Sequence, residues 1–306
     1  MARIPGANRY FRYLAPLYPR AFEGFDLRAY DTILSSTSAW AKGVRVAPGT
    51  VHICYIHTVS RFVFDYDRYL GGFGLRSLVR PLVERLSAWD RSAARLPTHY
   101  IANSQVVADR VRRYYGRDAE ILAPPIDIDR FSISNRVGDY ALVASRLLPY
   151  KRVDLAIDAA QAAGIRLLVA GSGPAEKALR ARAVGTTTTM LGFVDDSRVS
   201  ALLRDARVVI LPGEEDFGLV PLEAAASGRP TLAFRGGGAC ETVIEGVTGA
   251  FFDEPTPESL ASALQRFDAS SYDPSRMRAH AEQFSSERFI TQLRAIVARV
   301  RAERGL

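Results

Sequence analysis

Two cations in the second half of the chain have the types and the spacing to hold a phosphate group. Arg146 follows an apolar run that resembles a buried strand, and Lys151 opens the helical pattern after it. An Arg side chain can hold two phosphate oxygens at once, Lys supplies a compact charge, and a helix N-terminus favours anions. The pair therefore suits a diphosphate, although a solvated pair of cations at a helix start has the same pattern.

The segment from Gly213 to Glu223 is the most specific of the chain. Three acids, Glu214, Glu215 and Asp216, stand between an apolar run and a helical pattern. Acids at a helix start stabilise it by about 0.3–1 kcal/mol, so a structural role is open. Carboxylates also accept hydrogen bonds from sugar hydroxyls. Three of them at the end of a buried strand favour hydroxyl recognition over a purely structural role.

The start of the next helix adds backbone donors and another carboxylate. Free amides near Phe217, Gly218 and Leu219 can donate to a phosphate or sugar oxygen. Glu223 lies eight positions after Glu215. In a helix that begins near Gly218, Glu223 sits about one turn inside and can reach a second part of the same ligand.

A glycine-rich turn and a histidine complete the candidate residues. Gly171 and Gly173 lie in a G-S-G-P run between an apolar strand-like run and a helical pattern, where glycine lets a ligand approach the backbone. The dinucleotide fingerprint fails, because Glu176 occupies its third glycine position, and a tight turn explains the glycines equally well. His57 ends a strand-like run and can donate a hydrogen bond or exchange a proton, or it can be structural.

The elements that must position these residues follow a βαβ rhythm in the second half, which predicts one doubly wound parallel sheet. Strands are expected at Tyr140–Ser145, Ile165–Gly171, Thr188–Phe193, Val208–Pro212, Pro230–Phe234 and Gly249–Phe252. Helices are expected at Arg152–Ala163, Ala175–Ala183, Ser197–Ala206, Gly218–Ser227 and Ala239–Glu245.

The first half predicts a smaller α/β domain with few strands. These strands are Asp31–Thr37, Val51–His57, His99–Asn103 and Ala119–Leu122, with helices at Arg76–Ala94 and Gln105–Tyr115. Pro124 and Pro125 stiffen an extended connector, so we place a domain boundary after it, near Arg130. A last helix over Ser285–Arg304 carries an apolar stripe that must pack on another element. The expected division is 1–130, 131–284 and 285–306.

Composition excludes several classes. The 306 residues are 48% hydrophobic and 24% charged, with no apolar run long enough for a membrane span and no secretory signal. Cys54 and Cys240 are expected to be reduced thiols, and the scattered His and Cys residues predict no metal site. The net charge is +7, and only three of the 40 basic residues are Lys. We expect a basic surface, with attraction to phosphates or an acidic bilayer as the alternative and no nucleic-acid partner.

In these residues the chain resembles glycosyltransferase family 4, whose members have the GT-B architecture of two facing Rossmann-like α/β domains. The resemblance runs through most of the chain and grows specific where the paired glutamates with Phe217-Gly218 follow the Arg/Lys pair. Its elements are Tyr30-Asp31 with Ser35-Ser36, Ala41-Lys42-Gly43, His52 to His57-Thr58, Ile101-Ala102-Asn103-Ser104, Pro124-Pro125-Ile126-Asp127, Ser145-Arg146-Leu147 with Lys151-Arg152, Gly171-Ser172-Gly173-Pro174, Leu191-Gly192-Phe193, Glu215 to Glu223, and Gly237-Gly238 with Glu241.

The resemblance implies roles for the candidate residues. Arg146 and Lys151 would hold the donor's diphosphate and stabilise the departing phosphate in place of a divalent ion. Glu215 would hold hydroxyls of the donor sugar with backbone amides at Phe217 to Leu219, and Glu223 would bind the ribose. His57 would face the donor sugar from the other domain, to which the last helix would return. Members transfer a sugar from a nucleotide diphosphate sugar with retention of configuration, without a bound metal or other cofactor.

The region from His52 to Arg61 is most similar to members that build bacterial surface polysaccharides, often mannosyltransferases. The donor would be GDP-mannose or a UDP-sugar, and the acceptor a glycan or a lipid-linked sugar. Such enzymes work in the cytoplasm, commonly at the inner membrane face. The basic, aromatic opening (Arg9, Tyr10, Phe11, Arg12, Tyr13) and the Arg-rich stretch Arg76–Arg95 would then face a membrane.

The chain departs from the family pattern in two places. Val59-Ser60 follows His57-Thr58 where close relatives usually carry Pro-Met. About 80 residues that family members place before the region of Tyr30-Asp31, including a glycine-rich loop, have no counterpart here. A truncation, a short form completed by another chain and a remodelled first domain each explain this, and each leaves a first sheet that lacks strands and favours self-association or a partner.

The alternative function is a non-catalytic module that binds nucleotide sugars. A nicotinamide-dependent dehydrogenase is a weaker alternative, because the dinucleotide fingerprint is missing.

Overall fold

The computed structural model describes residues 15–64, 76–134 and 136–306 of the chain. Their contacts divide the chain into two units, Met1–Leu122 with Thr291–Leu306, and Ala123–Ile290. The predicted domain division remains a proposal. One predicted feature, the basic, aromatic opening Arg9–Tyr13, lies outside the described residues.

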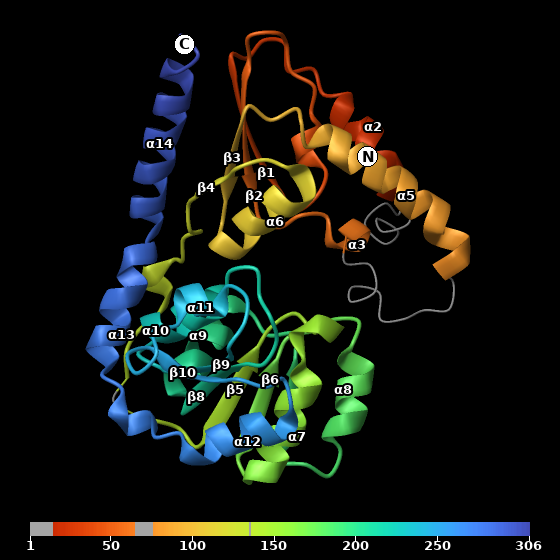
Figure 1. Ribbon diagram of the computed structural model, residues 1–306. Coiled ribbons are helices and arrows are strands. Elements are labelled where there is room, and N and C mark those ends of the chain that lie inside the picture. The colour runs from red at the N-terminus through yellow and green to blue at the C-terminus, as the bar shows by residue number, and fades with distance from the viewer. Residues whose placement is uncertain (1–14, 65–75, 135) are drawn as a thin grey trace. The chain divides into compact units, whose positions relative to one another are not determined.

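The first unit contains a parallel sheet whose described strands follow the order β1-β2-β3-β4 (Figure 1). The strands are β1 (Thr32–Thr37), β2 (Val51–Ile56), β3 (His99–Ala102) and β4 (Glu120–Ile121). Helix α5 (Arg76–Ala93) connects β2 to β3, and α6 (Gln105–Tyr115) connects β3 to β4. Each crossover thus returns the chain to the same end of the sheet, so that loops after β1, β2 and β3 share its carboxyl edge.

The two faces of this sheet have different partners. Cys54 and Tyr100 lie in register on one face and pack against Val107 and Val111 of α6. The opposite face carries Glu120, which accepts a hydrogen bond from Arg299 of the last helix, α14 (Ser286–Ala302). Helix α14 therefore covers the face that α6 leaves open.

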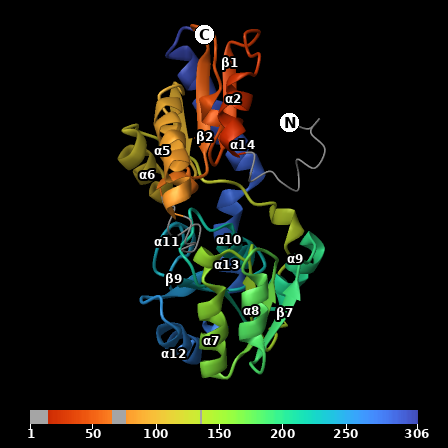
Figure 2. The same cartoon turned by 90° about the vertical axis from the view of Figure 1, so that its right-hand side faces the viewer.

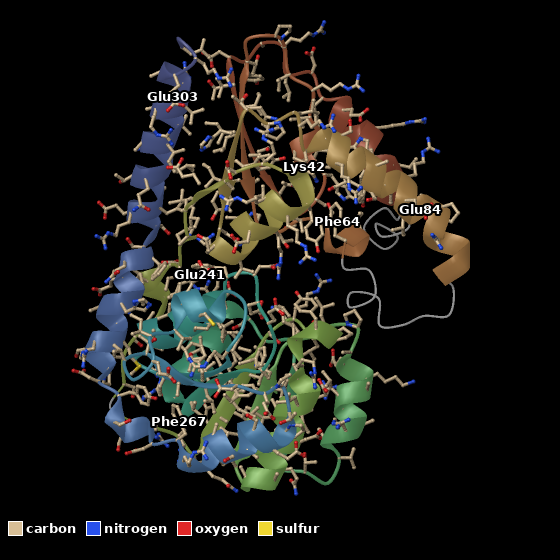
Figure 3. All side chains as sticks on the ribbon, in the orientation of Figure 1. Lys42, Phe64, Glu84, Glu241, Phe267 and Glu303 are labelled. Carbon is tan, nitrogen blue, oxygen red and sulfur yellow. The ribbon has the colours of Figure 1, made fainter. Side chains whose placement is uncertain are left out.

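Short helices surround these layers. They are η1 (Ala15–Leu17), α2 (Tyr18–Glu23), η2 (Ala41–Gly43) and α3 (Arg61–Phe64). The side chain of Lys42, labelled in Figure 3, belongs to η2 and is fully buried. Phe64 of α3, also labelled there, stacks on Tyr114 of α6 with ring centroids 4.6 Å apart.

The second unit is built on a six-stranded parallel sheet with the order β10-β9-β8-β5-β6-β7. Its strands are β5 (Tyr140–Ala144), β6 (Arg166–Ala170), β7 (Thr188–Gly192), β8 (Val208–Leu211), β9 (Thr231–Phe234) and β10 (Gly249–Phe252). From β5 the chain moves outward to β6 and β7, and then returns to place β8 on the other side of β5. The strand order therefore reverses between β5 and β8, as in the doubly wound dinucleotide-binding folds.

Helices cover both faces of this sheet, as Figure 2 shows in a second view. One core contains Val143 and Ile210 together with α7, α8 and α12, and the other contains Leu142 and Val209 together with α9, α10 and α13. These helices are α7 (Val153–Ala163), α8 (Glu176–Ala183), α9 (Asp196–Asp205), α10 (Leu219–Ala226), α12 (Pro257–Arg266) and α13 (Pro274–Ala281). Burial on both faces explains why the strands are apolar without alternation.

Short elements fill the remaining connections of the second unit. They are η3 (Ile128–Arg130), η4 (Pro149–Lys151), α11 (Ala239–Thr242), η5 (Ala269–Ser271) and η6 (Glu282–Phe284). The Ser285 hydroxyl accepts from the Arg288 amide and so caps the start of α14. No helix of the described residues is both long enough and apolar enough to cross a bilayer. The predicted fold class, α/β with two Rossmann-like units, is confirmed.

Candidate active site

The candidate residues of the second unit gather where its strand order reverses. Arg146 follows β5 and Glu215 follows β8, and these two strands are hydrogen-bonded neighbours. The helices after them, α7 and α10, pack on opposite faces of the sheet. Ligands of doubly wound sheets bind at the carboxyl edge where such connections diverge.

Lys151 and Glu215 meet directly at this edge. The Lys151 ammonium, at the end of η4, donates a hydrogen bond to Glu215 Oε1, and the two side chains are only 17% and 14% exposed. The same ammonium lies 5.3 Å from the ring centroid of Tyr150. A mostly buried ion pair needs further polar contacts to offset desolvation, and a ligand that offers phosphate oxygens and hydroxyls can supply them.

Arg146 differs from Lys151 in its surroundings. Its side chain is exposed, and no described residue forms a hydrogen bond or an ion pair with its guanidinium. An unpaired guanidinium beside a paired ammonium gives this edge a surplus of positive charge. That surplus suits an anion that arrives from solvent.

Glu223 is a mostly buried carboxylate on α10. Burial raises the pKa of its carboxyl above the ordinary value, the nearby charge of Arg130 lowers it, and that of Asp196 raises it. The carboxylate of Glu223 accepts no hydrogen bond from the described residues, although its backbone carbonyl accepts from the amide and hydroxyl of Ser227. The hydroxyl of a ligand could therefore donate to this carboxylate.

Arg130 and Asp196 were not among the candidates that the sequence predicted. They form an ion pair with 3.3 Å between Arg130 Nη2 and Asp196 Oδ2, and both charges act on Glu223. Asp196 opens α9 after β7, so its position in a loop at the carboxyl edge was the available signal. Arg130 lies in η3, far from the other candidates in sequence, and nothing in the pattern pointed to it.

Glycines bring the backbones of the edge loops into contact. A Cβ on Gly171, which has φ +135°, would lie 1.9 Å from the carbonyl oxygen of Ser145, and one on Gly173 would lie 2.4 Å from that of Leu147. The Leu147 amide also donates to the carbonyl of Ser172 over 3.0 Å. Loop packing thus accounts for both glycines, and their contact with a ligand remains a prediction.

The acidic loop is held in the same way. A Cβ on Gly213 would lie 2.5 Å from the carbonyl oxygen of Tyr150, and one on Gly237 2.4 Å from that of Glu215. The Gly238 amide donates to the Glu215 carbonyl over 2.8 Å. The backbone of Glu215 is therefore fixed by the loop after β9, and its side chain starts from a defined position.

The residues at the start of α10 contribute through their backbone. The Phe217 side chain is buried and packs near Phe284, with ring centroids 6.1 Å apart. Gly218, at φ +94°, takes the N-cap position without a side-chain cap, and Leu219 is exposed. No side chain of the described residues caps the first amides of α10, which leaves them suited to a phosphate or sugar oxygen.

His57 belongs to the first unit, one residue beyond β2. Its amide donates to the Thr37 carbonyl over 2.8 Å, and Asn103 Nδ2 donates to its carbonyl over 3.1 Å. Its Nε2 lies 2.8 Å from Ser36 Oγ. The histidine is therefore held at the carboxyl edge of the first sheet by the end of β1 and by the loop after β3.

The described residues contain two free thiols and no group of side chains that could hold a metal ion. Cys54 is buried and Cys240 is exposed, and both are free thiols, as predicted. Burial raises the pKa of Cys54 to about 11. Within residues 15–64, 76–134 and 136–306, no three His, Cys, Asp or Glu side chains gather as a metal site would require.

Sequence comparison finds bacterial relatives. A D-inositol 3-phosphate glycosyltransferase of Rhodococcus opacus is 28% identical over 225 residues, which is 61% of this chain and 50% of the relative. A GDP-mannose-dependent alpha-(1-6)-phosphatidylinositol dimannoside mannosyltransferase of Mycobacterium tuberculosis is 38% identical over 127 residues, or 39% of this chain and 33% of the relative. The chain thus spans about half the length, or less, of these curated relatives.

Solved structures show the same fold. Sucrose-phosphate synthase of Thermosynechococcus elongatus superposes with a TM-score of 0.73 at 17% identity, covering 97% of this chain and 80% of that one. HepE of Anabaena in complex with UDP gives a TM-score of 0.67 at 20% identity, covering 96% and 84%. These likenesses establish the GT-B fold.

Family comparison covers both halves of the chain. Residues 127–284 match the glycosyl transferases of group 1, and residues 2–130 match Glycosyltransferase Family 4. The first match alone spans more than half of the chain and contains the whole candidate site of the second unit. The chain belongs to the group 1 glycosyl transferases, with a first part of the family 4 type and the GT-B fold.

Proposed function

We propose that the protein transfers a hexose, with mannose as the first candidate, from a nucleotide diphosphate sugar to a glycan or lipid-linked acceptor. The transfer would retain the anomeric configuration and need no metal ion. Family membership supports the reaction class. The names of the relatives support the donor, since one is GDP-mannose-dependent and HepE was solved with UDP.

The observation that carries this proposal is the charge arrangement at the carboxyl edge of the second sheet. The exposed Arg146 and the paired Lys151 supply positive charge after β5, and the mostly buried carboxylate of Glu223 lies on α10, the helix after the neighbouring strand β8. In the proposed complex, Arg146 and Lys151 bind the diphosphate, and Glu215 accepts from donor-sugar hydroxyls. Glu223 accepts from the ribose, whose hydroxyls would satisfy its unpartnered carboxylate.

The same residues explain how the bond to the leaving group would break. As the sugar departs, negative charge develops on the nucleoside diphosphate, and Arg146 and Lys151 stabilise it at fixed positions. The amides at the start of α10 add donors to the same region. Because Lys151 already contacts Glu215, its ammonium can turn toward phosphate while the carboxylate turns toward the sugar.

Ligand-induced stabilisation tests the donor assignment. We expect UDP or GDP at about 100 times its Kd to stabilise the protein by about 2.7 kcal/mol, seen as a rise in Tm. The Glu223→Gln variant should lose most of this rise, whereas Glu258→Gln, an exposed acid in the first turn of α12, should keep it. An equal rise in both variants would remove Glu223 from the site. Turnover in EDTA tests metal independence.

The alternative is a non-catalytic module that binds nucleotide sugars and works with a partner chain. Sugar transfer by the isolated chain to any lipid or glycan acceptor excludes this alternative. Nucleotide binding without transfer favours it.

We also propose two kinds of surface contact. Helix α5 exposes Arg80 and Leu82, which suits peripheral attachment to an anionic membrane face in the cytoplasm.

Strand β1 is an edge of the described sheet, and its exposed Leu34 lines an open cavity of about 440 Å³ with Leu293 and Val297 of α14. That edge suits self-association or a partner chain. Sedimentation with anionic vesicles tests the membrane contact of α5. Light scattering tests self-association through β1.

A further inference from the structure

Two adjacent serines of β1 each hydrogen-bond a histidine, on opposite faces of the first sheet. Ser35 lies in register with Cys54, and Ser36 with Tyr55. Successive side chains of a strand point to opposite faces, so Ser36 shares a face with Tyr55 and His57. The strands therefore present two Ser–His pairs whose environments can be compared directly.

The pair formed by Ser35 and His52 is internal. Ser35 Oγ lies 2.8 Å from His52 Nε2, the histidine is fully buried, and its Nδ1 has no partner among the described residues. Burial lowers the pKa of His52 to about 4, so the ring is neutral near neutral pH. This hydrogen bond satisfies a buried group and has no access to a ligand.

The pair formed by Ser36 and His57 lies at the surface. The distance between Ser36 Oγ and His57 Nε2 is again 2.8 Å, but Ser36 is exposed and His57 is only partly buried. The backbone of His57 is already held by Thr37 and Asn103. The Tyr55 ring meets the imidazole edge to face, with centroids 5.1 Å apart. Backbone and stacking contacts place the residue, and the Ser36 hydroxyl meets the imidazole at Nε2.

We propose that Ser36 is a positioning residue that fixes the imidazole of His57 for the sugar-transfer reaction. An exposed hydrogen bond adds little to folding stability, so orientation is the property that this one can control. The catalytic part of the proposal rests on the proposed function and on the predicted role of His57. The geometric part, that Ser36 determines the state of the ring, stands without any substrate.

The geometric part is tested by NMR of the imidazole groups. The chain has four histidines, and the His57→Gln variant assigns the His57 signals. Ser36→Ala should move the His57 ring resonances and their titration midpoint, and leave those of His280 in the second unit unchanged. Ser36→Thr, which keeps the hydroxyl, should restore them. Unmoved His57 signals in Ser36→Ala would overturn the proposal.

The kinetic part uses the neighbouring pair as a matched control. We expect Ser36→Ala to lower kcat about tenfold with little change in donor KM, and Ser36→Thr to recover most of the loss. Ser35→Ala should instead lower Tm and leave kcat of the folded protein unchanged. Equal kcat in Ser36→Ala and the parent chain would contradict the positioning role. A parent chain without turnover refutes the proposed function, and the NMR result then decides the role of Ser36.

Discussion

The two units each contain an ion pair between a lysine and a carboxylate, and the pairs differ in how fully they are satisfied. In the first unit, Lys42 and Asp90 are 1% and 0% exposed, with 2.5 Å between Nζ and Oδ1. In the second unit, Lys151 and Glu215 keep 17% and 14% of their side-chain surface in contact with solvent. The difference separates a pair that holds a fold together from a pair that can exchange partners with a ligand.

The Lys42–Asp90 pair has its polar contacts supplied from within the unit. Asp90 accepts hydrogen bonds from Ser60 Oγ over 2.5 Å and from Tyr115 OH over 2.7 Å, and Lys42 also donates to the carbonyl of Ala39. These residues come from η2, the loop after β2, and helices α5 and α6. One carboxylate thereby ties the loop that begins at His57 to two helices.

The largest expected effect concerns the contribution of the buried Lys42–Asp90 pair to the stability of the fold. We expect Asp90→Ala to destabilise the protein by about 3–5 kcal/mol, because it leaves the Lys42 ammonium buried without a counter-charge. Urea denaturation measures the loss. The double variant Lys42→Met with Asp90→Leu should lose less than the two single losses together. Additive losses would show that the pair is not coupled.

The second test asks whether the Lys151–Glu215 pair, which solvent still reaches, is functional. Glu215→Gln should lower kcat about 100-fold, since the neutral amide holds donor-sugar hydroxyls less strongly in the transition state. The same change should cost far less stability than Asp90→Ala, because solvent still reaches Lys151. Kinetics and urea denaturation on one preparation give both values. A variant that loses stability but keeps its kcat would make this pair structural too.

A smaller effect is expected from the unpaired cation. Arg146→Met should weaken binding of a nucleoside diphosphate about tenfold and leave Tm unchanged, because the described residues make no ion pair with Arg146. Titration calorimetry measures the affinity. Arg276→Met, an exposed arginine on α13, serves as the matched control and should change neither value. Equal weakening in both variants would mean that only net charge matters.

The smallest effect concerns the pH dependence of stability. The raised pKa of Glu223 means that the folded protein holds this proton more tightly than the unfolded chain does. Stability contributed by the protonated carboxyl is therefore lost as the pH rises through the folded pKa. Glu223→Gln should be more stable than the parent chain near pH 7, and this difference in the free energy of unfolding should disappear near pH 4. Denaturation at both pH values checks this, and a constant gap would argue against the buried carboxylate.

Much of the fold could be predicted because its strands are unusually clear. Val208–Leu211 and Arg166–Ala170 are apolar runs bounded by turns, and the structure confirms them within one or two residues. Helices α12 and α13 were missed, although Pro257 and Pro274 stand at their first positions. Both helices follow the last predicted strand, so no later strand marked where a helix between two strands should lie.

The sequence predicted which residue types gather at the carboxyl edge of the second sheet, but not their contacts. The sequence indicated that Lys151 and Glu215 serve one ligand, but not that they bond each other across 64 positions. Of the two charges that act on Glu223, Asp196 could have been found from its place after β7, but Arg130 carries no local signal, because tertiary packing alone brings it near. The Ser36 hydroxyl at His57 follows from strand register, which the sequence does not specify.

The glycine contacts at the carboxyl edge of the second sheet also limit how this protein can diversify. Any larger residue at Gly171, Gly173, Gly213 or Gly237 would collide with a neighbouring main chain. Adaptation to another donor must therefore proceed by exchanging projecting side chains such as Leu219, while the loop paths are inherited unchanged. Directed evolution of donor preference should accordingly leave these four codons untouched.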